Sequence, residues 1–259
     1  MGYEGYQLSG EYTLGQVSKS LTPKGLSILK EVGLKLPYYI SNYKGGRNES
    51  FMYGVDRENI WIDYDLISAY TTVMAGLGSP NYKQARKLDE GDLKRMSFQE
   101  ILYSFIILKV QFKFSKSVKY PSISCTLDKG VNYHPLEGEA VITGAEYLLA
   151  MNQQCELKIK EIYYIPFDEG IYPFKEIIKD LQAERRRHPK DSLPNKLNKE
   201  LGNSIYGLLV RGINDKRKYD IRLGETVRME GNQLSNPILA SWITAFIRSV
   251  IGECLHNIQ

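Results

Sequence analysis

The stretch Lys199-Glu-Leu-Gly-Asn203-Ser204-Ile205-Tyr206-Gly207 has the pattern K-x₃-N-S-x-Y-G and is the most informative part of this 259-residue sequence. On a helix, Lys199, Asn203 and Tyr206 occupy positions i, i+4 and i+7, and they therefore share one face. A cation, an amide and an aromatic ring on one face suit the binding of a nucleoside triphosphate better than they suit a hydrophobic core. Gly207 either leaves room for a close approach of backbone or bases, or simply ends the helix.

A second short pattern, D-x₂-S-x-Y, lies far upstream at Asp65-Leu-Ile-Ser68-Ala-Tyr70. The apolar run from Ile60 predicts a buried strand that ends near Asp65, with Asp63 projecting from the same face. A carboxylate at a strand end beside a loop is a suitable ligand for Mg²⁺, which prefers oxygen donors. The alternative interpretation of the two acids is an edge strand with solvated carboxylates.

The composition is that of an ordinary globular chain, with 42% hydrophobic residues, 25% charged residues and a net charge of +4. The basic residues gather around the K-x₃-N-S-x-Y-G segment, at Arg185, Arg186, Arg187, Lys190, Lys196, Lys199, Arg211, Lys216, Arg217 and Lys218. This clustering predicts a surface for a polyanion, although a solvated helix face is the usual fate of such runs.

The cysteines and histidines show no spacing that is typical of a metal site or a disulfide framework. Cys125, Cys155 and Cys254 lie far apart, which favours free thiols in a reducing compartment. The N-terminus lacks the features of a signal peptide. The apolar stretch from Ile238 to Ile251 is interrupted by polar residues, and we expect it to be too short and too polar to span a bilayer.

The periodicity of the sequence predicts an α+β fold. Residues 98–167 look largely extended, interrupted by a capping box at Thr143 that opens a short helix. We expect helices over Gly25–Leu36, over Asn195–Leu209 with Leu197, Leu201, Ile205 and Leu208 on one face, and from Pro237 onward with Asn236 as the cap. Residues 210–235 are polar and contain glycine, which predicts a hairpin.

The two motifs in this order resemble motifs A and B of family B DNA polymerases. The chain is similar to the protein-primed branch of that family, which is found in bacteriophages, adenoviruses and organellar linear plasmids. Tyr43-Lys44-Gly45-Gly46 resembles the Y-x-G-G motif, which touches the template strand in these enzymes. The resemblance covers nearly the whole chain from Tyr43 onward, and it implies part of a polymerase palm with an antiparallel sheet, helical fingers and two insertions.

The resemblance also implies roles for individual residues. Asp65 is the catalytic carboxylate that binds the Mg²⁺ or Mn²⁺ ions, and Tyr70 packs under the deoxyribose. Lys199 holds the incoming triphosphate and Tyr206 packs against the nascent base pair. The full set of implied nucleotide-binding residues is Tyr70, Arg187, Lys199, Asn203, Tyr206 and Gly207, with Arg185 and Arg186 competing for the role of Arg187. The implied DNA-binding residues are Tyr43, Gly45 and Gly46.

The same resemblance divides the chain into six segments. They are an N-terminal segment (1–42), a palm part with motif A (43–97), an insertion of the kind that contacts a terminal protein (98–180), fingers with motif B (181–209), a second insertion (210–235) and a palm helix (236–259). Thr71 stands where the family usually has proline. A strand turn of type D-T-D or T-D-G, the family's motif C, occurs nowhere in the sequence. By the resemblance, we expect these 259 residues to include neither the exonuclease motifs nor the thumb.

Three hypotheses follow for the function. The first is a DNA polymerase component that binds primer-template DNA and deoxynucleoside triphosphates, with a second polypeptide supplying motif C and the thumb. The second is a non-catalytic nucleic-acid-binding module that retains the groove. The third is an interaction module that binds a terminal (priming) protein.

Overall fold

The computed structural model describes residues 36–60, 65–127, 131–211, 217–228, 232 and 234–258. The helix predicted over Gly25–Leu36 lies outside these residues except for Leu36, which begins the first described helix. Asp63 and most of the strand predicted before Asp65 also lie outside them.

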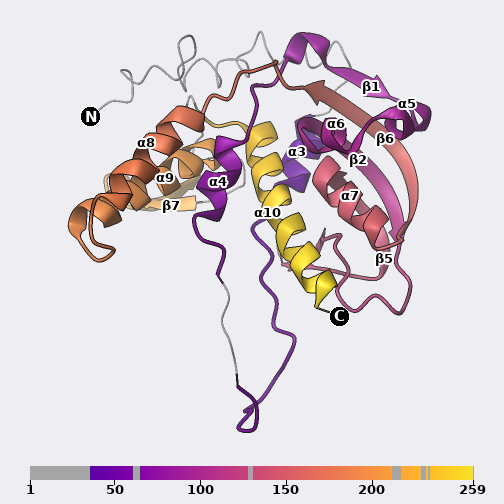
Figure 1. Cartoon of the computed structure of the whole chain (residues 1–259), viewed down its shortest axis with the longest axis horizontal. Coiled ribbons are helices and arrows are strands. Elements are labelled where there is room, and N and C mark those ends of the chain that lie inside the picture. The colour runs from indigo at the N-terminus through magenta and orange to yellow at the C-terminus, as the bar shows by residue number, and fades with distance from the viewer. Residues whose placement is uncertain are drawn as a thin grey trace.

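The described chain combines helices with antiparallel strands, which confirms the α+β class (Figure 1). The helices are α3 (Leu36–Asn42), α4 (Ala69–Ala75), the 3₁₀ turn η2 (Tyr82–Gln84), α5 (Glu90–Arg95), α6 (Phe98–Leu102), α7 (Gly144–Asn152), α8 (Lys175–Arg186), α9 (Leu193–Val210) and α10 (Pro237–Asn257). The strands are β1 (Arg86–Leu88), β2 (Ser104–Lys113), β3 (Cys125–Thr126), β4 (Asn132–Tyr133), β5 (Glu137–Thr143), β6 (Glu156–Pro166), β7 (Arg217–Asp220) and β8 (Glu225–Arg228).

The main sheet has the strand order β1-β6-β2-β5, and every neighbouring pair is antiparallel. Its central strand β2 is rich in the β-branched and aromatic residues that suit a pleated, buried surface. Leu108 of β2 lies opposite Ile162 of β6 and Ile142 of β5, and these side chains join one hydrophobic cluster. Figure 1 shows α6 and α7 packed on one face of this sheet. The segment predicted to be extended is therefore this sheet.

A second hydrophobic cluster forms around α10, which lies between the sheet and the helices α4, α8 and α9 (Figure 1). The side chain of Asn236 caps this helix as predicted, because it accepts hydrogen bonds from the backbone N–H groups of Ile238 and Leu239 at 3.1 Å each. By length and composition α10 could cross a membrane, contrary to our expectation from the shorter apolar stretch. Ile243 and Trp242 are nevertheless buried in this cluster, so α10 packs here as a core helix.

The two ends of the strand predicted before motif A, Ile60 and Asp65, are exposed and lie in no strand, and residues 61–64 between them lie outside the described ranges. On α9, Leu197 and Leu201 are 53% and 42% exposed, whereas Ile205, Leu209 and Gly202 are buried. Of the four residues that periodicity placed on one face, Ile205 is therefore buried and Leu197 and Leu201 are exposed. The buried side of α9 includes Gly202, which α4 approaches through Thr71.

Candidate active site

A pocket of about 240 Å³ lies where α8 and α9 meet the start of α4. Asp65 and Ser68 come from the segment before α4, while Lys199 and Asn203 come from α9. The full lining is Asp65, Ile67, Ser68, Thr71, Ile178, Leu181, Gln182, Arg185, Lys190, Asn198, Lys199, Gly202 and Asn203. The structure therefore brings motif A and motif B to one cleft, with a carboxylate on one side and cations on the other.

Gly202 lets α9 approach α4 closely enough to form this pocket. A Cβ atom added at Gly202 would lie 2.9 Å from Cγ2 of Thr71, which is closer than such contacts are found. The turn between α8 and α9 is fixed by Asn195, whose Nδ2 donates to the carbonyl oxygens of Arg185 at 2.8 Å and His188 at 3.2 Å. Local sequence thus fixes both the close helix contact and the reversal that place Lys199 beside Arg185.

Arg185, rather than Arg187, is the arginine that lines the pocket. Its Nη1 donates to Oγ of Ser68 at 3.3 Å, and its Nε is buried without a partner among the described residues. Ser68 itself has a φ of 54°, a left-handed conformation that few non-glycine residues adopt and that is frequent at functional sites.

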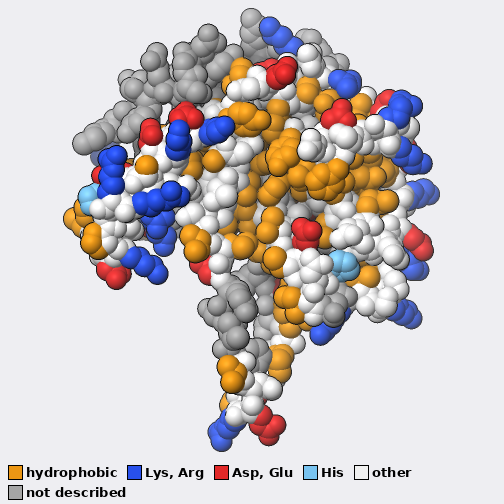
Figure 2. Space-filling view, in the orientation of Figure 1, with side chains coloured by type: hydrophobic (Ala, Val, Ile, Leu, Met, Phe, Trp, Pro, Cys, Tyr) orange, Lys and Arg blue, Asp and Glu red, His pale blue; other side chains and the backbone are white. Residues whose placement is uncertain are grey.

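Arg187 instead pairs with Glu184 at 2.8 Å and does not line the pocket. Figure 2 shows lysine and arginine side chains gathered over α8 and α9. The phosphate-binding role of Arg187 stays a prediction, and Arg185 and Lys190 join it as candidates on the basis of their position.

Three tyrosines from three distant motifs form one cluster. The rings of Tyr70 and Tyr206 lie with their centroids 4.4 Å apart at an angle of 36°. Tyr43 lies beside Tyr206, and burial, followed by the interaction with Tyr43, raises the pKa of Tyr206 far above its ordinary value. Gly46 is close to this cluster as well, because a Cβ added there would lie 3.5 Å from the hydroxyl oxygen of Tyr70.

Gly207 lies within α9 rather than at its end, so the interpretation as a helix stop was wrong. A Cβ added to Gly207 would meet nothing within 4 Å, and the same holds for Gly45. Packing within the described part of the chain therefore does not require glycine at either position.

The described residues do not complete a site for the metal ions that the motifs imply. Asp65 is the only acidic side chain among the described residues that line the pocket. Among the same residues, there is no group of three His, Cys, Asp or Glu side chains that could hold a metal ion. Asp63, the second acid of the predicted strand, lies outside the described ranges. The chain as described offers one carboxylate ligand at this position.

Comparison with known proteins decides the family. No family model matches the chain. The primer-independent DNA polymerase PolB of Escherichia coli is 33% identical over 225 residues. The chain is a relative of the protein-primed family B DNA polymerases. The matched region is 84% of this chain but 25% of PolB, so the chain spans about a quarter of the length of that polymerase.

Solved structures of phi29 DNA polymerase share the fold of this chain. The ternary complex with primer-template DNA and incoming nucleotide substrates aligns with a TM-score of 0.55 at 16% identity, covering 96% of this chain and 46% of the other. The orthorhombic crystal form aligns with a TM-score of 0.53 at 14% identity. At these identities the likeness shows the fold alone, and it supports the partial polymerase architecture expected from the motifs.

Proposed function

We propose that this family B chain is part of a DNA-directed DNA polymerase that adds deoxynucleotides to a DNA primer or to a priming protein. The observation that carries the proposal is the shared pocket of Asp65, Lys199 and Asn203, which joins residues of motif A to residues of motif B. A carboxylate facing cations across a cleft suits a nucleoside triphosphate, whose phosphates need cations and whose bound metal needs carboxylates.

Each side chain has a distinct task in this proposal. Lys199 and Arg185 bind the triphosphate, because both cations line the pocket. Asn203 lies one helical turn after Lys199 and adds an amide contact. Tyr70 packs under the deoxyribose and leaves no room for a 2′-hydroxyl, while Tyr206 packs against the nascent base pair. Tyr43 and the backbone at Gly45 and Gly46 contact the template strand.

Bound Mg²⁺ or Mn²⁺ ions supply the charge stabilisation that two-metal nucleotidyl transfer requires. Asp65 is the one ligand that this chain contributes from its described residues. We propose that the remaining carboxylates come from a second polypeptide that carries motif C and the thumb. This arrangement accounts for a pocket whose described lining residues include several cations but only one carboxylate.

The segment before motif A offers a surface on which such a polypeptide docks. Residues 48–60 run away from the body of the molecule between α3 and α4 (Figure 1). The segment exposes large apolar side chains, namely Phe51, Met52, Tyr53, Val55 and Ile60, by between 52% and 107%. Exposed apolar side chains in series are typical of an interaction surface. The sheet of the first insertion, residues 98–180, is the proposed contact for a terminal protein.

A second candidate function is a non-catalytic nucleic-acid-binding module, which the single acidic lining residue favours. Photocrosslinking separates the two candidates. The chain is mixed with primer-template DNA and an azido-deoxynucleoside triphosphate, and the crosslinked peptides are identified by mass spectrometry.

A polymerase component is expected to crosslink at peptides of α9 and of the segment around Tyr70, and to do so only when the next template base pairs with the nucleotide. DNA binding without templated nucleotide capture supports the non-catalytic module. Failure to bind primer-template even at low salt contradicts both functions.

A further inference from the structure

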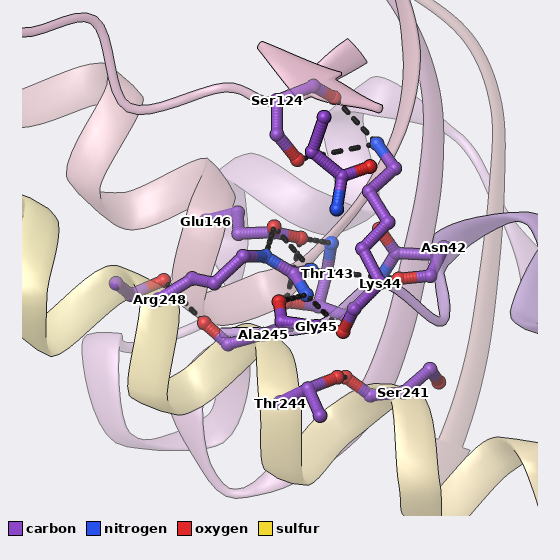
Figure 3. A network of polar contacts seen from close by, with 12 residues as sticks. Asn42, Lys44, Gly45, Ser124, Thr143, Glu146, Ser241, Thr244, Ala245 and Arg248 are labelled. Carbon is purple, nitrogen blue, oxygen red and sulfur yellow. Dashed lines mark hydrogen bonds and ion pairs between the residues drawn. The ribbon is translucent and has the colours of Figure 1, made fainter. Parts of the chain in front are cut away.

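Beneath the tyrosine cluster lies a buried ion pair between Glu146 of α7 and Arg248 of α10. Both side chains are 3% exposed, and Nη2 of Arg248 lies 2.7 Å from Oε1 of Glu146 (Figure 3). Burying two charges is costly unless they are paired and their other hydrogen-bonding groups are satisfied. A single arginine in an apolar core helix therefore needs a specific set of partners.

All five N–H groups of Arg248 have partners in the structure. Nε and Nη2 donate to Glu146 at 3.1 and 2.7 Å. Nη1 donates to the carbonyl oxygens of Lys44 at 2.9 Å and Gly45 at 3.2 Å, and Nη2 also reaches the carbonyl of Asn42 at 3.4 Å. The guanidinium thus holds three carbonyls of one short loop, at the C-terminal end of α3, where carbonyls lack helical partners.

The two residues next to the guanidinium are themselves fixed. The other carboxylate oxygen of Glu146 accepts from the N–H and the hydroxyl of Thr143, which closes the capping box of α7. Burial raises the pKa of Glu146, but Arg248 and then Lys44 outweigh it and keep that pKa below its ordinary value. Lys44 in turn donates from Nζ to the carbonyl of Ser124 at 2.5 Å.

Tyr43 stands inside the loop that the guanidinium holds. Its backbone lies between the carbonyls of Asn42 and Lys44, while its side chain lies beside Tyr206. The position of the Tyr43 hydroxyl, and through it the orientation of the Tyr206 ring, therefore depends on the backbone that Arg248 fixes.

We infer that Arg248, oriented by Glu146, is a positioning residue that sets the Tyr43–Tyr206–Tyr70 cluster of the nucleotide site. The expected effect on DNA binding rests on the proposed function, whereas the positioning of the three tyrosines by Arg248 does not. It also gives α7 a role in the site, because that helix supplies the carboxylate that orients Arg248.

The test uses the full chain labelled with 3-fluorotyrosine and ¹⁹F NMR. The resonances of Tyr43, Tyr70 and Tyr206 are assigned by single replacements with phenylalanine. Arg248→Lys keeps the charge but cannot satisfy five acceptor contacts, because an ammonium has three donors. We expect the Tyr43 and Tyr206 resonances to move in Arg248→Lys, while the resonance of Tyr219, which is 64% exposed on the β7–β8 hairpin, stays in place.

Phe112→Leu is the control for a general loss of stability, because Phe112 of β2 belongs to the hydrophobic cluster formed by the main sheet. It is expected to leave the Tyr43 and Tyr206 resonances unmoved. Glu146→Gln, which keeps the size of the side chain, is expected to move the same two resonances as Arg248→Lys, and it decides the question if Arg248→Lys does not fold. Unmoved Tyr43 and Tyr206 resonances in a folded Arg248→Lys or Glu146→Gln variant would overturn the inference.

Affinity for primer-template DNA with a correct nucleotide gives a second readout. We expect Arg248→Lys to weaken this affinity about tenfold, which corresponds to a loss of roughly 1.4 kcal/mol in binding free energy. Adding Tyr43→Phe to Arg248→Lys should then cause little further loss, because both changes act through one contact. Fully multiplicative losses would contradict the inference. If the wild-type chain binds no DNA, the proposed function fails and the ¹⁹F result still decides the positioning role.

Discussion

Tyr70 and Tyr206 pack against each other with ring centroids 4.4 Å apart, although one belongs to motif A and the other to motif B. The contact joins the same two motifs that supply Asp65 and Lys199 to the pocket. In the proposed polymerase, this pair separates the sugar and the base of the incoming nucleotide, and the predictions below depend on that geometry.

Replacing Tyr70 by valine should relax sugar selection while leaving the chemistry intact. The smaller side chain leaves space where the ring excludes a 2′-hydroxyl. In extension assays with the second polypeptide present, we expect ribonucleotide incorporation to rise by at least about tenfold relative to deoxynucleotides, the effect of ~1.4 kcal/mol. Tyr219→Val on the exposed hairpin is the control. An unchanged ratio would mean that Tyr70 does not border the sugar.

The cations of the pocket should contribute to the salt dependence of DNA and nucleotide binding. The affinity for primer-template DNA with bound nucleotide falls as salt is added, and this fall is measured as the slope of log affinity against log salt concentration. Each lost phosphate contact makes that slope shallower by about 0.7 to 0.9. We expect this reduction for Lys199→Ala and Arg185→Ala but not for Lys158→Ala, an exposed lysine on the sheet. The same titration on Arg187→Ala shows whether that residue contacts phosphate in the complex. Equal slopes for all variants would make the basic cluster a solvated surface.

Two glycines of α9 should respond oppositely to alanine. Gly202→Ala forces a Cβ to within 2.9 Å of Thr71 and should lower the free energy of unfolding by about 1–3 kcal/mol. Gly207→Ala meets nothing within 4 Å and should raise it by up to about 1 kcal/mol, because alanine is the better helix former. Urea denaturation measures both. A Gly207→Ala variant that is more stable but binds primer-template more weakly would show that the open space serves a ligand.

His134 should make the fold sensitive to mild acid. Burial, followed by the neighbouring Arg47, lowers the pKa of His134 from 6.5 to about 4, so the folded chain keeps this ring neutral. Between about pH 6.5 and 4 the unfolded chain binds the proton and the folded chain does not. The free energy of unfolding should therefore fall as the pH falls through this window, by at most about 1.4 kcal/mol per pH unit.

Urea denaturation at several pH values measures the effect of His134, and His134→Gln should flatten the profile in that window. Carboxylates near the surface titrate in both proteins, so the difference between the two profiles is the relevant quantity. If the two profiles run parallel, His134 is not the titrating group.

The local patterns of the sequence predicted the helix caps and the fold class well. Asn236 before Pro237 and the capping box at Thr143 both form as predicted, because these contacts involve residues close in sequence. The buried side of α9 could not be derived in this way, since it depends on the approach of α4 at Gly202. The resemblance to family B motifs grouped Asp65 with Lys199 without any knowledge of the packing, and these two residues line one pocket.

The residues that sequence analysis missed are those whose partners are distant along the chain. Arg185 was one of three consecutive arginines, and only the reversal between α8 and α9 selects it for the pocket. Arg248 carried a recognisable signal, since an arginine in a core helix requires a partner, but nothing in the sequence identified Glu146 or the carbonyls after α3. The further metal ligands that the motifs imply could not be compared with the sequence analysis in this way, because they are not among the described residues.

Reconstituted primer extension tests the central claim most directly. The chain is assayed with Mg²⁺ and primer-template DNA, alone and with a polypeptide that carries motif C and the thumb of PolB. We predict little or no extension by the chain alone, clear extension by the pair, and loss of that extension in Asp65→Asn. Robust extension by the isolated chain would show that its own carboxylates complete the metal site, and extension by the pair that survives Asp65→Asn would contradict the assignment of the catalytic pocket.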